Sequence, residues 1–478
     1  MTLTHLTDFS DRISPMLVKE LRQGLRAKTF IAVFLTLQIF LGIMLLSASA
    51  ASTTDRAGSV VSGMIFGFFS LAVLIVQPLR GVAALATEIK GNTIDMMVLT
   101  RLSAWRIVFG KWVALVSQSA LILSTIIPYL ILRYFFGGMN LVGEMVFLGL
   151  LFLTSMGLTA ITVGLSGSSS VIIRSILPLF GTPVLFMAIM GLLFGNGSRE
   201  IVEICSLDNL ESTTNLALYV VSIAYLGWSA LSLGTSLIAP AAENHSTPRR
   251  LVALAAMGMM IPVMLRSTLD IELLATLIGL IAAPAILLAL TEPTLLVPTV
   301  CVPFVRRGLP GKLAGIFLYP GLASGVFFTM LLAAIALFVF QIHPTASYDA
   351  EFDVIVLSML GVLLFPAVLQ CFFFKGEGQR VANYMLLLLG SGILTGILAI
   401  LASAMSNHGF LWVFIWNPMV FMVMTDFGKF SDADLFIAVS AVDLILVTIL
   451  FIKAITLFKS SREVIQQAEE TLTAPDPR

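Results

Sequence analysis

Repeated runs of about twenty residues with almost no charge constrain the fold of this chain more than any other feature. Of its 478 residues, 58% are hydrophobic and only 11% are charged, whereas a soluble domain has about 25% charged residues. A run of 18 or more apolar residues is long enough to cross a bilayer as a helix. Transmembrane β-barrels are excluded because their strands alternate apolar and polar residues. The sequence therefore predicts an all-α, polytopic transmembrane helical bundle.

Two of the apolar segments are irregular. Residues 251–266 are short for a span, and in residues 410–424 the pair Asn417-Pro418 interrupts the run. We count the first as a span and interpret the second as an interfacial or re-entrant piece. The twelve predicted spans are then residues 29–50, 59–78, 112–133, 143–165, 171–195, 216–239, 251–266, 273–291, 313–342, 354–374, 383–405 and 435–458.

The distribution of lysine and arginine sets the orientation. With a cytoplasmic N-terminus, twelve spans place 22 of the 27 basic residues inside, and 27 − 22 = 5 remain outside. Those five are Arg56, Arg133, Arg199, Arg266 and Lys429. Omitting 251–266, or adding 410–424, would move basic clusters outside. We therefore predict that both termini are cytoplasmic, in a membrane of the bacterial inner-membrane type.

Residues 14–28, SPMLVKELRQGLRAK, form a basic amphipathic pattern before the first span. Ser14 and Pro15 suit a helix start. The leucines recur every four residues, and basic side chains occupy the other side. This pattern predicts a helix on the inner membrane surface, attracted by anionic lipid. The alternative is a generic juxtamembrane helix without a specific role.

The second and third predicted spans are separated by a polar segment of about 33 residues, 79–111. Ordinary connections are much shorter. Gly91 interrupts it, Asn92 can cap a short helix that begins at Thr93, and Asp95 suits the first turn of that helix. Ser103 can cap the next helix, which continues into the third span. The segment is either a lever that a partner pushes or a solvated interfacial loop.

Two motifs in order carry a family resemblance. PMLVKELRQGLRAKTF precedes the first span, and E-x-K-G-N-T-x-D-x-x-x-L-T-x-L-S-x-x-x-I-x-x-G-K follows the second. Together they resemble the membrane subunit of type-2 ATP-binding-cassette (ABC) exporters. Members more often have Gly-Thr where this chain has Gly91-Asn92-Thr93. The matching positions are Lys19, Glu20 and Arg22 in an elbow helix, and Glu88, Gly91, Thr93, Asp95, Leu99, Thr100, Leu102, Ser103, Gly110 and Lys111 in a coupling segment.

The resemblance implies a non-catalytic permease subunit whose coupling helix docks into a separate ABC ATP-binding subunit. ATP and magnesium are then expected on that partner, because no P-loop is present: Gly110-Lys111 and Gly311-Lys312 lack its other residues. The resemblance also implies a homodimer or a heterodimer with another permease. We expect membrane lipid but no nucleic acid as a further partner.

The resemblance covers about residues 13–240, the usual six-span unit. We therefore expect a permease-like unit in residues 1–240 and an additional six-span region in residues 241–478. No second elbow or coupling motif is found in the second region, so a tandem duplication is not expected.

One acidic residue lies well inside a predicted span. Asp443 in the last span is costly in lipid and must face protein or water. It is either a proton or substrate site, with Arg174 as a candidate partner, or a structural carboxylate. Arg133 and Lys453 lie near span ends and are expected to snorkel. The scattered cysteines and histidines predict no metal site.

Three functions follow from these patterns. The first is an exporter permease that works by alternating access, with an apolar or amphipathic substrate because few charges lie in the membrane. The second is an ion-coupled secondary transporter, which usually needs several ionisable sites near the middle of the membrane. The third is a structural subunit of a membrane complex. We expect no catalytic residue in the chain, because clustered His, Asp or Glu are lacking.

Overall fold

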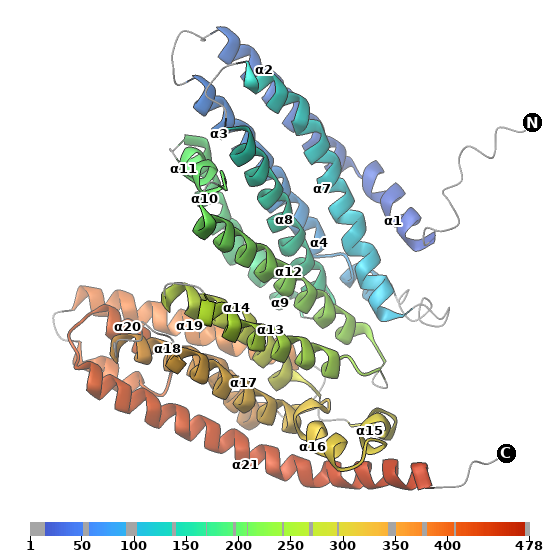
Figure 1. The fold of residues 1–478 in the computed structure, drawn as a ribbon, viewed down its shortest axis with the longest axis vertical. Helices are drawn as coiled ribbons and strands as arrows, with labels where there is room; N and C mark the ends of the chain where they lie inside the picture. Colours follow the sequence, from blue (N-terminus) through green and yellow to red (C-terminus); the bar gives the residue numbers. More distant parts are fainter. Residues whose placement is uncertain are drawn as a thin grey trace, which may run out of the picture. The chain divides into compact units, whose positions relative to one another are not determined.

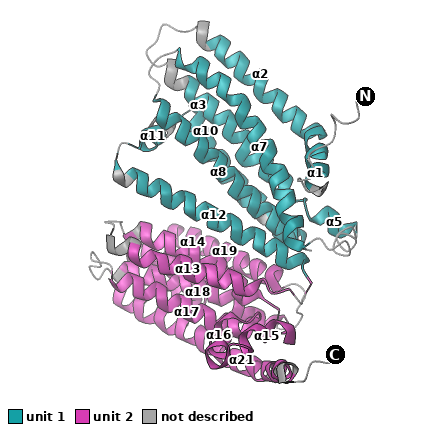
Figure 2. Cartoon of the chain, turned by 45° about the vertical axis from the view of Figure 1, so that its right-hand side comes forward, with its two compact units in different colours: residues 1–239 teal, residues 240–478 magenta. Residues whose placement is uncertain are grey.

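The structure is a computed structural model, and the chain divides into two compact units, residues 1–239 and 240–478 (Figure 1; Figure 2). Among the residues it describes, every regular element is a helix, so the predicted all-α bundle is confirmed. The described residues are 15–50, 57–91, 103–135, 140–168, 170–194, 197–207, 209–240, 243–266, 271–293, 296–342, 350–374, 380–405 and 408–473.

Unit 1 is built from a short helix before the first span and a bundle of long helices. Two of the long helices contain π-helical turns, labelled η, where the backbone bulges between α-helical parts. The elements are α1 (Pro15–Arg26), α2 (Lys28–Ala50), α3 (Ala57–Ser70), η2 (Leu71–Val76), α4 (Gln77–Gly81), α5 (Ala86–Lys90), α7 (Ala104–Tyr134), α8 (Leu141–Ser166), α9 (Val171–Ile176), η3 (Leu177–Gly181), α10 (Thr182–Phe194), α11 (Gly197–Ile204) and α12 (Leu210–Ile238).

The core of unit 1 joins α2, α3, α7 and α8. Phe66 and Phe147 meet edge to face with ring centroids 4.9 Å apart, and Ile122 is fully buried in the same cluster. Helices α8 and α12 approach so closely that a Cβ atom added to Gly164 would collide with the carbonyl oxygen of Ala230. Glycine is therefore required for this packing, because no side chain fits between the two backbones.

Unit 2 is a second bundle with its own core, which includes Val354, Leu398, Phe421 and Val439. Its elements are α13 (Ser246–Arg266), α14 (Ile271–Thr291), α15 (Pro298–Val305), α16 (Gly308–Leu318), α17 (Leu322–Ile342), α18 (Ala350–Phe373), α19 (Arg380–Ala404), the 3-10 helix η4 (Gly409–Phe414), α20 (Met419–Asp426) and α21 (Asp432–Thr473).

Eleven helices in the described part of the chain are long and apolar enough to cross a membrane. The twelfth predicted span corresponds to α13, which is not among the eleven. Helix α13 is nevertheless continuous over 21 residues, or about 31 Å, close to the thickness of the hydrocarbon core. Its place as a span therefore stays a prediction.

Two predicted boundaries were wrong. The expected span 313–342 is two helices, because the chain breaks at Tyr319–Gly321, where Gly321 has φ +119°. The second span, expected to end at residue 78, continues as helix through α4 and α5 to Lys90, whereas α7 starts at Ala104 directly after Ser103, as predicted. The second and third spans are therefore longer than the apolar runs, and only residues 92–102 of this segment lie outside the described residues.

Residues 410–424 do not form one spanning helix. They contain η4 and the first part of α20, each too short to cross a bilayer. The buried Asn417 between them donates hydrogen bonds from Nδ2 to the Ser391 carbonyl oxygen at 3.2 Å and to Thr395 Oγ1 at 3.0 Å. The break in the helix is therefore stabilised by α19.

Candidate functional site

Three helices of unit 1 meet at a charged cluster centred on Lys111, near the start of α7. Its Nζ atom lies 2.9 Å from Glu20 Oε1 in α1 and 3.2 Å from Glu88 Oε1 in α5. The Lys111 side chain is buried, and both carboxylates are mostly buried, with exposed fractions of 17% and 16%. One ammonium group therefore joins the helix before the first span to the helices on both sides of residues 92–102.

Arg80 in α4 adds a second connection between the same elements. Its Nη1 atom donates hydrogen bonds to Gln77 Oε1 at 3.1 Å and to Gln118 Oε1, and its Nη2 atom donates to the Gly24 carbonyl oxygen at 3.4 Å. The guanidinium also lies 5.8 Å from the ring centroid of Phe30, within range of a cation–π contact. A Cβ atom at Gly24 would meet the side-chain amide of Gln118, so α1 and α7 lie close together at this glycine.

The cluster borders an open depression of about 340 Å³. Its polar lining consists of Glu20, Gln23, Arg80, Thr87, Glu88, Lys111 and Gln118. The two carboxylates already share the lysine, and the arginine is occupied by amide and carbonyl oxygens. The arrangement of these described residues is that of a clamp between helix ends.

The structure brings together only some of the residues that the sequence predicted for this site. Glu20 and Glu88 lie in the cluster, whereas Lys19 and Arg22 are on the exposed side of α1. Gly91 is the exposed C-cap residue of α5. Five further predicted site residues lie in the part of the chain that the structure does not describe: Thr93, Asp95, Leu99, Thr100 and Leu102.

Ser103 is the N-cap residue of α7, as predicted, but its side chain makes no capping hydrogen bond. Sequence reasoning matched Lys111 to the family motif without giving it a role, and it missed the roles of Arg80 and Gln118. The sequence did contain a sign of these roles, because Arg80, Lys111 and Gln118 are polar residues at or near strongly apolar segments.

Asp443 in α21 is buried, and neither carboxylate oxygen has a hydrogen-bond partner among the described residues. One of these oxygens lies against Gly361 of α18. The candidate partner Arg174 donates from Nε to the Ser170 carbonyl oxygen at 3.4 Å. Because Arg174 belongs to unit 1 and Asp443 to unit 2, their pairing stays a prediction.

The prediction that Arg133 snorkels was wrong. Its side chain is buried, and it donates from Nε to Ser62 Oγ at 2.6 Å and from Nη2 to Glu144 Oε1 at 3.2 Å. A long basic side chain snorkels when no acceptor is near, and here α8 supplies a carboxylate at the right depth. Lys453 is exposed on α21.

Unit 2 contains a second, more deeply buried charged cluster, which the sequence did not reveal. Glu292, directly after α14, accepts from Arg249 Nη2 at 3.4 Å, from Arg250 Nη2 at 2.5 Å and from the Gly321 backbone N–H at 2.9 Å. Arg250 also donates to Ser324 Oγ at 3.0 Å. This cluster, too, joins the ends of three helices.

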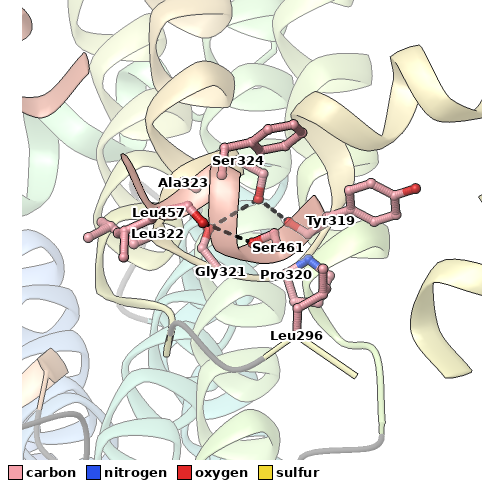
Figure 3. A pocket seen from close by; sticks show the side chains of 10 residues that line it. Leu296, Tyr319, Pro320, Gly321, Leu322, Ala323, Ser324, Leu457 and Ser461 are labelled. Carbon is pink, nitrogen blue, oxygen red and sulfur yellow. Dashed lines mark hydrogen bonds between the residues drawn. The ribbon is translucent and has the colours of Figure 1, made fainter. Parts of the chain in front are cut away.

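The turn between α16 and α17 lies between this cluster and α21. Ser324 Oγ donates hydrogen bonds to the carbonyl oxygens of Tyr319 and Gly321 (Figure 3). Leu457 and Ser461 of α21 line the small pocket beside the turn. Because Glu292 and Ser324 satisfy the turn's polar groups, the chain can break there without leaving the Gly321 N–H unpaired.

Family models, curated proteins and solved structures give no match to this chain. The class that the helices define is a multi-pass integral membrane protein with the build of a transporter. The particular function therefore has to be argued from the two charged clusters and from the motifs in the sequence.

Proposed function

We propose that this chain is the membrane-spanning permease subunit of an ATP-driven ABC exporter, with ATP hydrolysis on a separate subunit. The observation that carries the proposal is the clamp around Lys111. The described residues on both sides of 92–102 are fixed to each other and to α1 through Glu20 and Glu88. A force applied to residues 92–102 would therefore reach the second and third spans together.

The mechanism follows from this mechanical connection. The two ion pairs of Lys111 hold the ends of α1, α5 and α7 together, so these helix ends move as a group. Nucleotide-driven closure of two ATPases would displace the segment that contains Thr93, Asp95 and Leu99. The displacement would then pass to α5 and α7 and expose the substrate path alternately to the two sides of the membrane.

The same proposal includes the surroundings of the protein. The exposed Lys19 and Arg22 of α1 suit anionic lipid headgroups on the cytoplasmic surface. Both termini are placed in the cytoplasm, and the membrane is of the bacterial inner-membrane type. Few charged side chains lie within the spans, which favours an apolar or amphipathic substrate.

Co-expression with an ATPase tests the proposal. The chain is produced with each ABC ATP-binding subunit of its native organism in turn, and co-purification and ATP hydrolysis are measured. The double variant Asp95→Lys/Leu99→Asp should weaken binding of the cognate ATPase at least tenfold. The control Asp208→Lys reverses a charge on a predicted outer loop and should leave binding unchanged. Unchanged binding of every ATPase by the double variant would contradict the proposal.

Asp443 favours a second candidate function, an ion-coupled secondary transporter. Its carboxylate oxygens are buried and without a hydrogen-bond partner in the described part of the chain, as expected of a group that binds and releases a proton. Transport into vesicles driven by a proton gradient alone, and abolished in Asp443→Asn, would support this function. Transport that needs ATP and survives Asp443→Asn would exclude it.

A further inference from the structure

The two units share an order of six long helices. In each, a further stretch of chain lies between the second and third long helices and a short helix between the fifth and sixth, and unit 1 also has α1 before its first long helix. In unit 1 the long helices are α2, α3–α5, α7, α8, α9–α10 and α12, and the last insert is α11. In unit 2 they are α13, α14, α17, α18, α19 and α21, and the last insert is α20.

Most of the close helix pairings are shared as well, although α7 and α8, the third and fourth long helices of unit 1, pack closely without a counterpart among the described contacts of unit 2. Among the described residues, every pair of long helices in substantial contact in unit 2 has its counterpart in unit 1. The shared pairs, by order in the unit, are first–second, first–third, second–third, second–fourth, second–fifth, third–sixth, fourth–fifth and fourth–sixth. The insert before the sixth helix touches the fourth and fifth helices in both units. Order alone does not dictate this pattern, because six helices can pack in many ways.

The fourth and sixth helices approach at a glycine of the fourth helix in both units. In unit 1 a Cβ on Gly164 would collide with Ala230, and in unit 2 a Cβ on Gly361 would collide with Asp443. A backbone without a side chain lets the partner helix come close. Both pairs therefore meet at a glycine of the fourth helix, although Gly164 faces backbone near the end of α8 and Gly361 faces a side chain in the middle of α18.

The two charged clusters occupy the same place in this order. In each unit a glutamate at the end of the second helix, Glu88 or Glu292, accepts from groups at the start of other helices. In unit 1 the cation belongs to the third helix, and in unit 2 the cations belong to the first. Both clusters join the base of the segment between the second and third helices to the bundle.

We propose that unit 2 is a second copy of the unit 1 fold and that α15–α16 is a second docking segment for the ATPase. This inference rests on the proposed function, because it assigns to α15–α16 the partner proposed for residues 92–102. It differs from the expectation, drawn from the missing second elbow and coupling motifs, that residues 241–478 are not a tandem duplicate of the first region. One chain then carries two docking segments and binds two ATPase subunits.

The surface of α15–α16 suits a soluble partner with an acidic rim and an apolar groove. Arg306 and Arg307 are exposed at the turn between the two helices, next to Leu309, which is 72% exposed, and Leu313, which is 56% exposed. Two adjacent guanidinium groups favour carboxylates of a partner. Protruding leucines supply the apolar anchor that a specific interface needs.

The base of α15–α16 is firmly held, so a push on the turn would reach the long helices. Cys301, Phe304 and Tyr319 pack with Ala468 of α21 in one buried cluster, and Lys312 Nζ lies 2.6 Å from Glu469 Oε1. Helix α21 has 42 residues, or about 63 Å, about twice the thickness of a hydrocarbon core. Its last turns, which support α15–α16, therefore extend beyond the membrane.

The test counts ATPase subunits per chain. The complex of the full chain with its ABC ATPase is purified in detergent, and its mass is measured by light scattering with the detergent subtracted. The variants are Arg306→Glu/Arg307→Glu/Leu309→Asp in unit 2 and Asp95→Lys/Leu99→Asp in unit 1. The control is Arg266→Glu, which reverses a charge at the opposite, predicted outer end of α13.

The inference predicts two ATPases per wild-type chain and per control chain, one per chain for either variant and none for the combination. A unit 2 variant that keeps the wild-type number would overturn the inference and leave the proposed function intact. Loss of bound anionic lipid with an unchanged ATPase number would also overturn it, and would make α15–α16 a membrane-surface element. If no ABC ATPase binds the wild-type chain, the proposed function fails as well. A single symmetric peak in size-exclusion chromatography shows that each variant is folded.

Discussion

The charged clusters of the two units connect helix ends in both, but the numbers of acidic and basic residues are reversed. In unit 1 one cation, Lys111, lies between two carboxylates, and the cluster borders an open depression. In unit 2 one carboxylate, Glu292, lies between two arginines, and all three side chains are buried. The comparison teaches that ion pairs can connect helix ends at the same place in a fold although the acidic and basic residues are exchanged.

The difference has an energetic consequence. Charges in a buried cluster depend on each other because no water replaces a lost partner. Charges near an open depression are partly solvated, so losing one partner costs less. Substitutions in the cluster should therefore destabilise unit 2 more than unit 1. The helix ends at the unit 1 cluster should rearrange more easily.

The largest effect is expected for Glu292→Ala. The substitution leaves Arg249, Arg250 and the Gly321 N–H without their shared acceptor, at a cost of about 3–5 kcal/mol. The midpoint of thermal unfolding in detergent should fall strongly. The matched control is Glu463→Ala at an exposed position on α21, which should change stability by less than about 0.5 kcal/mol. Equal midpoints for the two variants would show that the cluster does not stabilise unit 2.

The next effect is expected for Gly164→Ala. The added methyl group would meet the Ala230 carbonyl oxygen, which is backbone and cannot turn aside, so α8 and α12 must separate. Overpacking of this kind costs about 1–3 kcal/mol, again visible as a lower unfolding midpoint. Gly149→Ala in the same helix is the control, because nothing lies within 4 Å of its new Cβ. That variant should be neutral or slightly stabilising.

A smaller loss is expected for Lys111→Met, about 1 kcal/mol, because Glu20 and Glu88 keep some contact with water. Coupling should suffer more than stability: ATPase stimulation by substrate should fall while ATPase binding persists. The triple variant Glu20→Gln/Glu88→Gln/Lys111→Met removes the unpaired charges and should recover most of the stability. A single variant that loses stability as severely as Glu292→Ala would contradict the distinction between the units.

The smallest effect is expected for Lys312→Ala. Its ion pair with Glu469 is short, at 2.6 Å, but both side chains are about 40% exposed. Such pairs contribute about 0–1 kcal/mol. The unfolding midpoint should therefore stay near that of the wild type. A loss comparable to that of Gly164→Ala would mean that α15–α16 depends on this pair and not on its apolar base.

The sequence predicted what depends on local pattern. Apolar runs located the long helices, Pro15 marked the start of α1, and Ser103 marked the start of α7. The end of the second span was less well predicted. It lies at Lys90 and not at residue 78, because the polar residues after 78 continue the helix and Glu88 of α5 pairs with Lys111. The length of an apolar run is therefore shorter than the helix when the last turns of that helix contain charged side chains that pair with each other.

The sequence could not predict contacts between distant positions. Glu292 follows the apolar α14 and precedes a proline, which is typical of an exposed loop, yet it is buried because two arginines and a backbone N–H surround it. The break at Tyr319–Gly321 is different, because it does have a local signal: Pro320-Gly321 is a dipeptide typical of turns, and the long apolar run around it concealed the break. The proposed resemblance between the two units is carried by helix pairings, whereas residues 241–478 show no second elbow or coupling motif.

The most direct test of the account is the side of the membrane on which the two proposed docking segments lie. In a chain with Cys205, Cys301 and Cys371 replaced by alanine, a single cysteine is introduced as Thr93→Cys or Leu309→Cys. Vesicles of defined orientation are then treated with a thiol reagent that cannot cross the membrane. The account predicts that both positions react in inside-out vesicles and neither in right-side-out vesicles. Reaction of Leu309→Cys only from the outside would contradict it, because the two units could not then receive ATPases on the same side.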